Sequence, residues 1–163
     1  MKIKYGMILA AGLGKRMQPI TLKTPKPLIK ISNKLLLERA IELLINHGVE
    51  EIAINIHHLG DQIRKFISQR QYKVKIIISD EQKMLLDTGG GIFHATRSFK
   101  EPFIVINPDT LWRDTYFNEL KNLEELYFKQ KKSCLLLVNK DLSFDNSLKG
   151  DFNLHNGVIS RDS

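Results

Sequence analysis

The sequence predicts an α/β domain with a mostly parallel sheet that is covered by helices on both faces. Two observations carry this prediction. Short apolar runs alternate with amphipathic stretches along most of the 163 residues, and the connections between them are short. This alternation is typical of strand–helix–strand units in layered α/β proteins. The length suits one domain with a sizeable core, and no repeat or linker divides it, so we treat residues 1–163 as a single domain.

The first half of the chain contains three predicted strands and two predicted helices. The strands are expected at Lys4–Ala10, Glu51–Ile56 and Lys73–Ser79. The first helix, Leu35–Ile45, has apolar residues at helical spacing and is followed by Gly48, a helix stop signal. The second helix, Leu59–Gln69, carries its apolar residues on one face.

The second half continues the alternation. A short helix is expected at Gly89–Phe99, a strand at Phe103–Asn107 and a helix at Tyr116–Gln130. A fifth strand is predicted at Cys134–Asn139, where Cys134 reads as a buried structural thiol. The last segment, Gly150–Ile159, is predicted to form a hairpin, because Asn156-Gly157 is a typical two-residue turn.

Three loops follow the predicted strands and should meet at one edge of the sheet. They contain Gly12, Glu81–Gly91 and Asn107–Asp109. In open parallel sheets, ligands bind beyond the carboxyl ends of the strands. The sequence therefore predicts a ligand site where these loops converge.

Composition and charge narrow the class of protein. The net charge of +7 favours anionic partners, either nucleic acid or phosphorylated small molecules. No zinc-ligand spacing or aromatic–basic interleaving marks a nucleic-acid surface. No apolar run reaches the ~18 residues that a membrane span needs, and no signal peptide is recognisable. A single cysteine excludes an internal disulfide. We therefore expect a cytoplasmic protein in a reducing environment that binds neither nucleic acid nor membrane.

The first loop has the chemistry of a phosphate site. Gly12 and Gly14 let the backbone approach a phosphate chain closely, so that its N–H groups become donors. Arg16 can fork onto phosphate oxygens, and Lys26 adds a point charge between two prolines. The loop lacks both the Walker Gly-Lys-Ser/Thr and the third dinucleotide-binding glycine, whose place is taken by Met17.

Each of these features also has a structural interpretation. Gly-x-Gly alone can be a plain turn, and Asp109 can be a turn or helix N-cap residue. Glu81 reads by default as an exposed loop glutamate. The triplet Gly89-Gly90-Gly91 can be a tight strand–helix junction, although close approach by a ligand explains three glycines better.

The whole string is more specific than its parts. Leu9-Ala10-Ala11-Gly12-Leu13-Gly14-Lys15-Arg16-Met17, followed by Pro25-Lys26-Pro27-Leu28, resembles the sugar-1-phosphate nucleotidylyltransferases. Within that family it is most similar to the bacterial N-acetylmuramate 1-phosphate uridylyltransferases and the small mannose-1-phosphate guanylyltransferase-like enzymes. The segments 86–93, 104–109 and 150–154 extend the resemblance, with Pro108 where relatives usually have glycine.

The resemblance implies a fold and a reaction. The fold would be the Rossmann-like three-layer α/β/α nucleotide-diphospho-sugar transferase fold, and its C-terminal part would be missing because the chain is shorter than the family. The reaction would join a nucleoside triphosphate, UTP by this resemblance, to a sugar 1-phosphate of the N-acetylmuramate or hexose type. The products would be pyrophosphate and an NDP-sugar, a cell-wall or polysaccharide precursor. Mg²⁺ would be the cofactor.

The resemblance also implies residue roles. Catalytic roles fall to Arg16, Lys26 and Asp109, and Asp109 would bind the metal. Nucleotide contacts would come from Leu9, Ala10, Ala11, Gly12, Gly14, Lys15, Arg16, Glu81, Asp87, Thr88, Gly89 and Asn107. Gly150 and Asp151 would lie on the sugar side.

Two alternatives stay open. One is a mannose-1-phosphate guanylyltransferase, which would use GTP. The other belongs to a different class: a catalytically incompetent nucleotide-binding or regulatory module, favoured because the family takes a second metal ligand and most sugar contacts from a segment downstream of Ser163.

Overall fold

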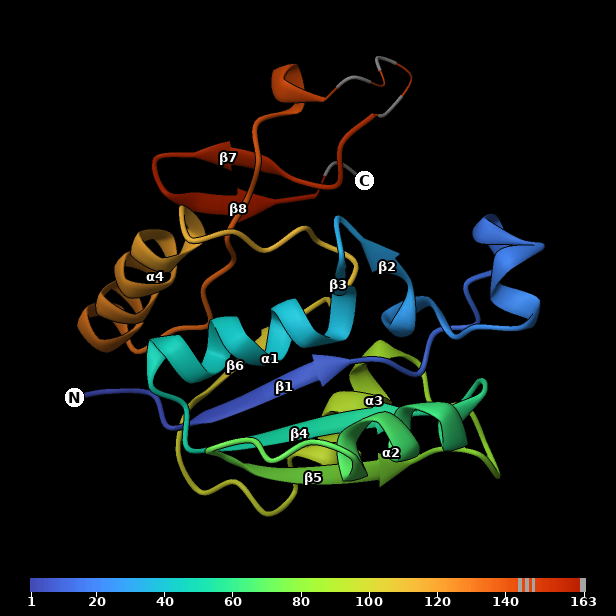
Figure 1. Cartoon of the computed structure of the whole chain (residues 1–163). Helices are drawn as coiled ribbons and strands as arrows, with labels where there is room; N and C mark the ends of the chain where they lie inside the picture. The colour runs from blue at the N-terminus through green and yellow to red at the C-terminus, as the bar shows by residue number, and fades with distance from the viewer. Residues whose placement is uncertain (144, 146, 148, 162–163) are drawn as a thin grey trace.

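A four-stranded parallel sheet forms the centre of the computed structural model, which describes residues 1–143, 145, 147 and 149–161. The strand order is β5-β4-β1-β6 (Figure 1). The strands are β1 (Tyr5–Leu9), β4 (Glu51–Ile56), β5 (Lys75–Asp80) and β6 (Phe103–Ile106). Ile8 of β1 pairs with Ile54 on one side and with Ile106 on the other. All carboxyl ends therefore lie at the same edge of the sheet.

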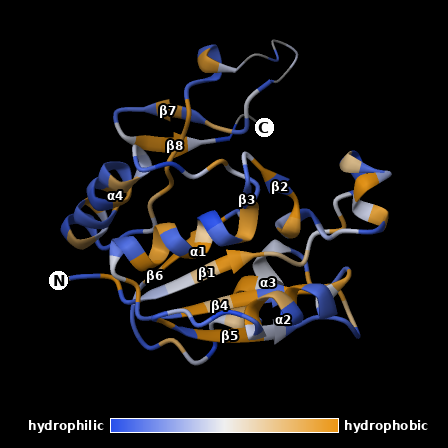
Figure 2. Cartoon of the chain, in the orientation of Figure 1, coloured by the Kyte–Doolittle hydropathy of each residue, from blue (hydrophilic) through white to orange (hydrophobic). Residues whose placement is uncertain are grey.

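Helices cover both faces of this sheet. On one face lie α1 (Leu36–His47), α2 (Gly60–Ser68) and α4 (Tyr116–Gln130), packed against the isoleucines of the strands. On the other lies α3 (Thr88–Ala95), which packs against Met7 and Ala53. In Figure 2 the strands are mostly hydrophobic, as expected for strands buried on both faces. The three-layer fold predicted from the sequence is confirmed.

Glycines fix the junction between β1 and α1. Gly48 ends the helix with φ 99°, and its N–H donates to the carbonyls of Leu44 (3.1 Å) and Ile45 (2.9 Å). This confirms the predicted stop signal. On the strand, a Cβ at Gly6 would lie 2.7 Å from Leu44 Cδ1, so any other residue there would require the Leu44 side chain to shift.

Several short elements surround the core. The first loop folds into three 3₁₀ turns, η1 (Lys15–Met17), η2 (Ile20–Leu22) and η3 (Lys26–Leu28), followed by a small hairpin of β2 (Lys30–Ile31) and β3 (Lys34–Leu35). The sequence did not predict these. Near the end of the chain lie η4 (Lys140–Leu142), β7 (Asn153–His155) and β8 (Val158–Ser160). Asn156 (φ 49°) and Gly157 (φ 76°) turn the last hairpin, as predicted.

The predicted strand Cys134–Asn139 is wrong. This segment belongs to none of the sheets formed by the described residues. In the four-stranded sheet, β6 is an edge strand that pairs with β1 alone. Leu135 and Val138 are exposed, and Cys134 is half-buried instead of buried. The apolar run has strand character, but a strand needs a partner for its backbone groups, and the described part of the chain supplies none.

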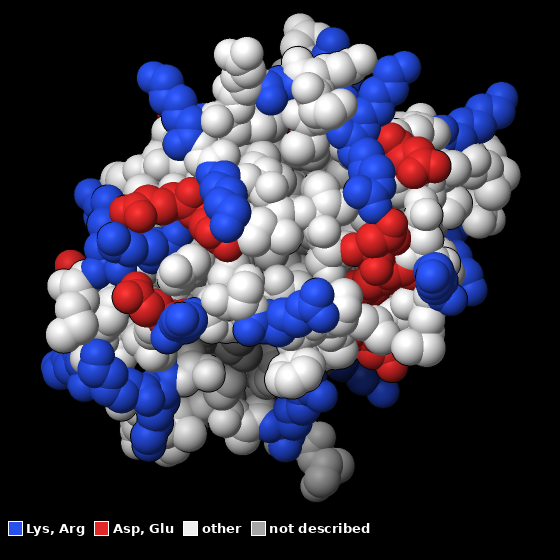
Figure 3. Space-filling model, turned by 90° about the horizontal axis from the view of Figure 1, so that it is seen from below, with Lys and Arg blue, Asp and Glu red and all other residues white. Residues whose placement is uncertain are grey.

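The surface carries both signs of charge. Seen from the β5 edge, Lys and Arg are interspersed with Asp and Glu and exceed them (Figure 3). None of the helices in the described ranges is both long and apolar enough to cross a bilayer.

A buried histidine lies where α1 meets α4. The His47 side chain is 2% exposed, and its Nε2 lies 3.3 Å from Glu124 Oε2. Glu124 also accepts a hydrogen bond from the Ile3 N–H. Burial lowers the pKa of His47 below its ordinary value of 6.5; Glu124 opposes this shift, while Lys2 and Lys121 add to it.

The lowered pKa predicts acid sensitivity of the fold. Because the pKa of His47 is lower in the folded chain, the unfolded chain binds this proton more readily below about pH 6.5, so the free energy of unfolding should fall as the pH decreases through that range. Urea unfolding at about pH 7.5 and about pH 5.5 measures the change. His47→Gln should lose less stability between the two than the wild type, whereas the control His155→Gln, at an exposed hairpin position, should lose as much. Equal losses for all three proteins would contradict the prediction.

Candidate functional site

A cavity of about 500 Å³ opens at the carboxyl edge of the sheet. It is bounded by the loop after β1, the loop after β5 and the turn after β6, which are the three loops that the sequence predicted to converge. Its lining residues are Leu9, Ala10, Ala11, Gly12, Gly14, Lys15, Arg16, Met17, Lys26, Pro27, Asn55, Leu85, Leu86, Asp87, Thr88, Asn107, Pro108 and Asp109.

The glycine loop is held in shape by its own backbone and by Thr21. Gly14 has φ 64°, and a Cβ there would lie 2.8 Å from Thr21 Cγ2, so glycine is required on both counts. The Thr21 hydroxyl, which is buried, donates to the Gly14 carbonyl at 2.8 Å. A Cβ at Gly12 would meet nothing within 4 Å, which leaves that peptide open to the cavity.

Three cations reach this cavity. Lys15 and Arg16 are exposed on η1, while Lys26 is half-buried between the buried Pro25 and Pro27. Lys26 Nζ lies 2.6 Å from Asp109 Oδ2, which joins the first loop to the turn after β6. The two side chains are 27% and 42% exposed, so the pair adds little stability. Its importance is positional, since it places a cation and a carboxylate at one point of the cavity wall.

Asn55 was missed by the sequence analysis, although it is a polar residue in the middle of an apolar strand. Its Oδ1 accepts from the Ala10 N–H at 2.8 Å, and its Nδ2 donates to Glu81 Oε1 at 2.8 Å. Glu81 is 2% exposed, and its Oε2 accepts from the Leu86 N–H at 3.0 Å. The default interpretation of Glu81 as an exposed loop residue is therefore wrong, because its carboxylate is buried and bonded to Asn55 of β4 and to the Leu86 N–H of its own loop.

Some predicted site residues do not line the cavity. Glu81 lies behind the wall, and Gly89, Gly150 and Asp151 are outside the lining as well. Gly91 is explained by packing and not by ligand approach, since a Cβ there would lie 2.8 Å from Glu81 Oε1. The nucleotide and sugar roles assigned to these residues stay predictions.

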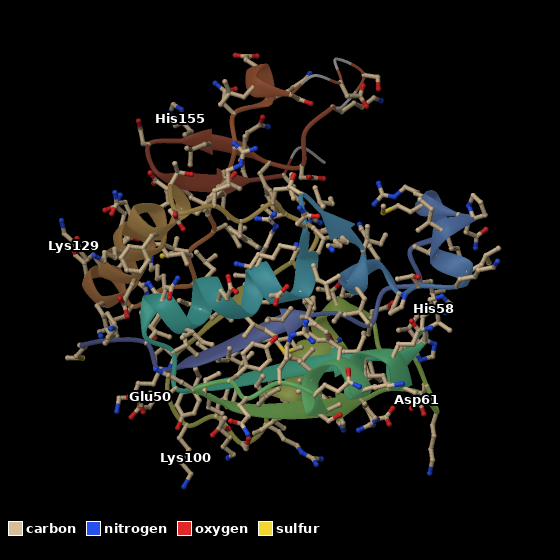
Figure 4. The ribbon with its side chains drawn as sticks, in the orientation of Figure 1. Glu50, His58, Asp61, Lys100, Lys129 and His155 are labelled. Carbon is tan, nitrogen blue, oxygen red and sulfur yellow. The ribbon has the colours of Figure 1, made fainter. Side chains whose placement is uncertain are left out.

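Two histidines brace the loops from the end of β4. The His58 ring lies 2.7 Å from the Thr21 carbonyl, and the His57 ring lies 2.7 Å from the Glu81 carbonyl. Each ring nitrogen donates, because a carbonyl can only accept. Figure 4 shows His58 at the carboxyl end of the strands beside the first loop, opposite the end that carries Glu50 and Lys100. The histidines therefore support the site without lining it.

The turn after β6 is held by Trp112. Its indole Nε1–H donates to the Asn107 carbonyl at 2.8 Å, and its ring packs edge-on against Tyr116. Trp112 is half-buried and packs against the core.

The described residues contain no cluster of three or more His, Cys, Asp or Glu side chains that could cage a metal ion. Asp109 and Asp87 do present carboxylates to the cavity. Mg²⁺ is commonly bound by one or two carboxylates, with water and substrate phosphates completing its shell. These residues therefore fit a hard cation that is shared with a phosphorylated ligand.

Residues 5–142 match the Nucleotidyl transferase family. The chain belongs to this family. Among curated members, the N-acetylmuramate alpha-1-phosphate uridylyltransferase of Caulobacter vibrioides is 39% identical over 113 residues, which are 67% of this chain and 47% of that protein. A mannose-1-phosphate guanyltransferase of Hypocrea jecorina is 35% identical over 120 residues, 71% of this chain and 32% of that protein.

Solved structures of the nucleotidyl transferase kind share the fold. HddC from Yersinia pseudotuberculosis, crystallised with GMP-PN, superposes with a TM-score of 0.63 at 31% identity, covering 74% of this chain and 54% of that one. The present chain thus spans about half the length of the Caulobacter relative and of HddC.

Proposed function

We propose that this chain is the nucleotide-binding part of a sugar-1-phosphate nucleotidylyltransferase, which makes an NDP-sugar and pyrophosphate from a nucleoside triphosphate and a sugar 1-phosphate. The observation that carries the proposal is the shared cavity: the glycine loop, Arg16, Lys26 and Asp109 all line it. Family membership supports the same reaction class.

The reaction requires no covalent enzyme intermediate. An oxygen of the sugar phosphate attacks the α-phosphorus in line, the bond to the β-phosphate oxygen breaks, and pyrophosphate leaves. The protein contributes positioning and charge stabilisation. Backbone N–H groups at Gly12 and Gly14 would bind the triphosphate, Arg16 the departing pyrophosphate, and Lys26 the reacting phosphate oxygens.

Mg²⁺ is the cofactor in this proposal, and bound there it would neutralise charge on the phosphate oxygens. Asp109 would hold it, with Asp87 on the same cavity. Lys26 is paired with Asp109, so engagement of this carboxylate by the cation would free the lysine for the phosphate oxygens.

UTP is the proposed nucleotide and an N-acetylmuramate-type or hexose 1-phosphate the proposed acceptor, by similarity to the Caulobacter enzyme. The proposed location is the cytoplasm. GTP with mannose 1-phosphate is the second candidate, supported by the Hypocrea relative. A nucleotide-binding module without turnover is the third candidate.

The first test is nucleotide binding and turnover by residues 1–163. We expect Mg²⁺-dependent binding of UTP, measured by calorimetry, with little or no pyrophosphate release on adding sugar 1-phosphates, because in-line transfer needs both reactants aligned. Calorimetric titrations with UTP and with GTP distinguish the two candidate nucleotides. The absence of binding by any nucleoside triphosphate would refute the proposal, and rapid turnover would refute the module.

Arg16→Ala should weaken binding of Mg–UTP by about 2 kcal/mol, because it removes charge-assisted hydrogen bonds to phosphate. Arg97→Ala is the matched control, since Arg97 is exposed and does not line the cavity. Calorimetric titration of both variants measures the difference. Unchanged affinity in Arg16→Ala would remove Arg16 from the site.

Asp109→Asn should abolish most Mg²⁺-dependent nucleotide binding while leaving the fold intact, since it removes a carboxylate ligand and retains the shape. Titration of the variant with UTP, with and without Mg²⁺, is compared with its circular dichroism. Asp61→Asn, on the surface of α2, is the control. If Asp109→Asn binds Mg–UTP like the wild type, Asp109 is a turn residue.

A further inference from the structure

The two walls of the cavity are joined by Asn55, which belongs to the lining itself, and by Glu81, which lies behind it. We propose that this buried pair is a positioning device, which sets the separation between the glycine loop and the wall formed by residues 85–88 and so controls affinity for a ligand that touches both. The part of the proposal that concerns nucleotide rests on the function proposed above.

The hydrogen bonds form a continuous chain between the two walls. The Ala10 N–H donates to Asn55 Oδ1, Asn55 Nδ2 donates to Glu81 Oε1, and the Leu86 N–H donates to Glu81 Oε2, at 2.8, 2.8 and 3.0 Å. Ala10 and Leu86 both line the cavity. Because both ends of the chain are backbone groups of the walls, any change in the pair moves a wall.

The pair has one allowed arrangement. The Ala10 N–H needs an acceptor, which fixes the orientation of the Asn55 amide, and its NH₂ group then needs the carboxylate. Both residues are at least 97% buried, so the loss of a partner leaves a donor or acceptor with little access to water. Gly91 confines them further, since a Cβ there would lie 2.9 Å from Asn55 Nδ2 as well as against Glu81.

The Glu81 charge is compensated by hydrogen bonds. Among the residues that the structure describes, no Lys, Arg or His side chain forms an ion pair with it. A buried carboxylate whose only support is N–H donors is sensitive to the loss of either donor. The two loops are therefore coupled. Loss of the hydrogen bond from the Leu86 N–H to Glu81 weakens the bond between Glu81 and Asn55, and this in turn weakens the bond between Asn55 and the Ala10 N–H.

Each of two isosteric single substitutions breaks this series of hydrogen bonds, and their combination restores it. Glu81→Gln replaces one acceptor oxygen with an NH₂ group, which must face either the Asn55 amide or the Leu86 N–H. Asn55→Asp places two carboxylates against each other. In the double variant N55D/E81Q the central hydrogen bond is reversed: the introduced glutamine donates to the introduced aspartate, and both backbone N–H groups keep an acceptor. Its net charge equals that of the wild type.

The first readout needs no nucleotide. Hydrogen–deuterium exchange of the ligand-free chain reports the Ala10 and Leu86 amides separately. We expect each single variant to speed exchange at both amides by about tenfold or more, because a charge-assisted hydrogen bond is lost, and the double variant to restore protection. If Glu81→Gln speeds exchange at Leu86 alone, the walls are not coupled and the proposal fails.

The second readout separates positioning from general stability. Mg–UTP should contact both walls, whereas Mg–tripolyphosphate has no base and should contact only the glycine loop. We expect the single variants to weaken UTP binding about tenfold and tripolyphosphate binding by less than about twofold, with recovery in the double variant. Thr96→Val is the matched control: it removes a buried hydroxyl that donates to the Ile92 carbonyl in α3, and it should lower the melting temperature without changing either affinity.

The outcomes distinguish the two proposals. Equal weakening of UTP and tripolyphosphate, unchanged UTP binding in the single variants, or a double variant that stays impaired would each overturn the positioning role. Failure of the wild type to bind either ligand would instead refute the proposed function, and the exchange experiment would then decide the coupling alone.

Discussion

The structure depends on one constraint, the parallel pairing of β1 with a strand on each side. Met7 and Ile8 are fully buried, one on each face of the sheet, and the register aligns the ends of β1, β4 and β6. Parallel pairing sends every following loop out at the same edge. The cavity is a consequence of this geometry, because the glycine loop, the loop after β5 and the turn after β6 all begin at that edge.

The loops at that edge are stabilised mainly by polar contacts with side chains from β4 and beyond. Asn55, His57 and His58 bond to the first loop and to the loop after β5, and Lys26 reaches Asp109 across the opening. Such contacts suit the proposed chemistry, in which the protein aligns phosphates and does not react with them. A site of this type depends on the rigidity of its walls more than on the reactivity of any side chain.

The features that could be predicted from the sequence are those that a local pattern of residues determines. Apolar runs predicted the four sheet strands, Gly48 predicted a helix end, and the glycine string together with the motif Pro25–Leu28 contains more than half of the cavity lining. Contacts between distant residues were not predictable in this way: Lys26 and Asp109 are 83 positions apart, and Asn55 and Glu81 are 26 apart. The apolar segment Cys134–Asn139 was misread for a related reason, because local character indicates strand propensity and says nothing about whether a pairing partner is present.

Trp112 gives the molecule a built-in optical reporter. It is the single tryptophan of the chain, and its indole N–H is bonded to the carbonyl of Asn107, a residue of the cavity lining. Indole emission responds to the polarity and hydrogen bonding around the ring. The intrinsic fluorescence of this protein, excited selectively at the tryptophan band, therefore reads out the state of the turn that carries Asp109, with no label and no engineered chromophore.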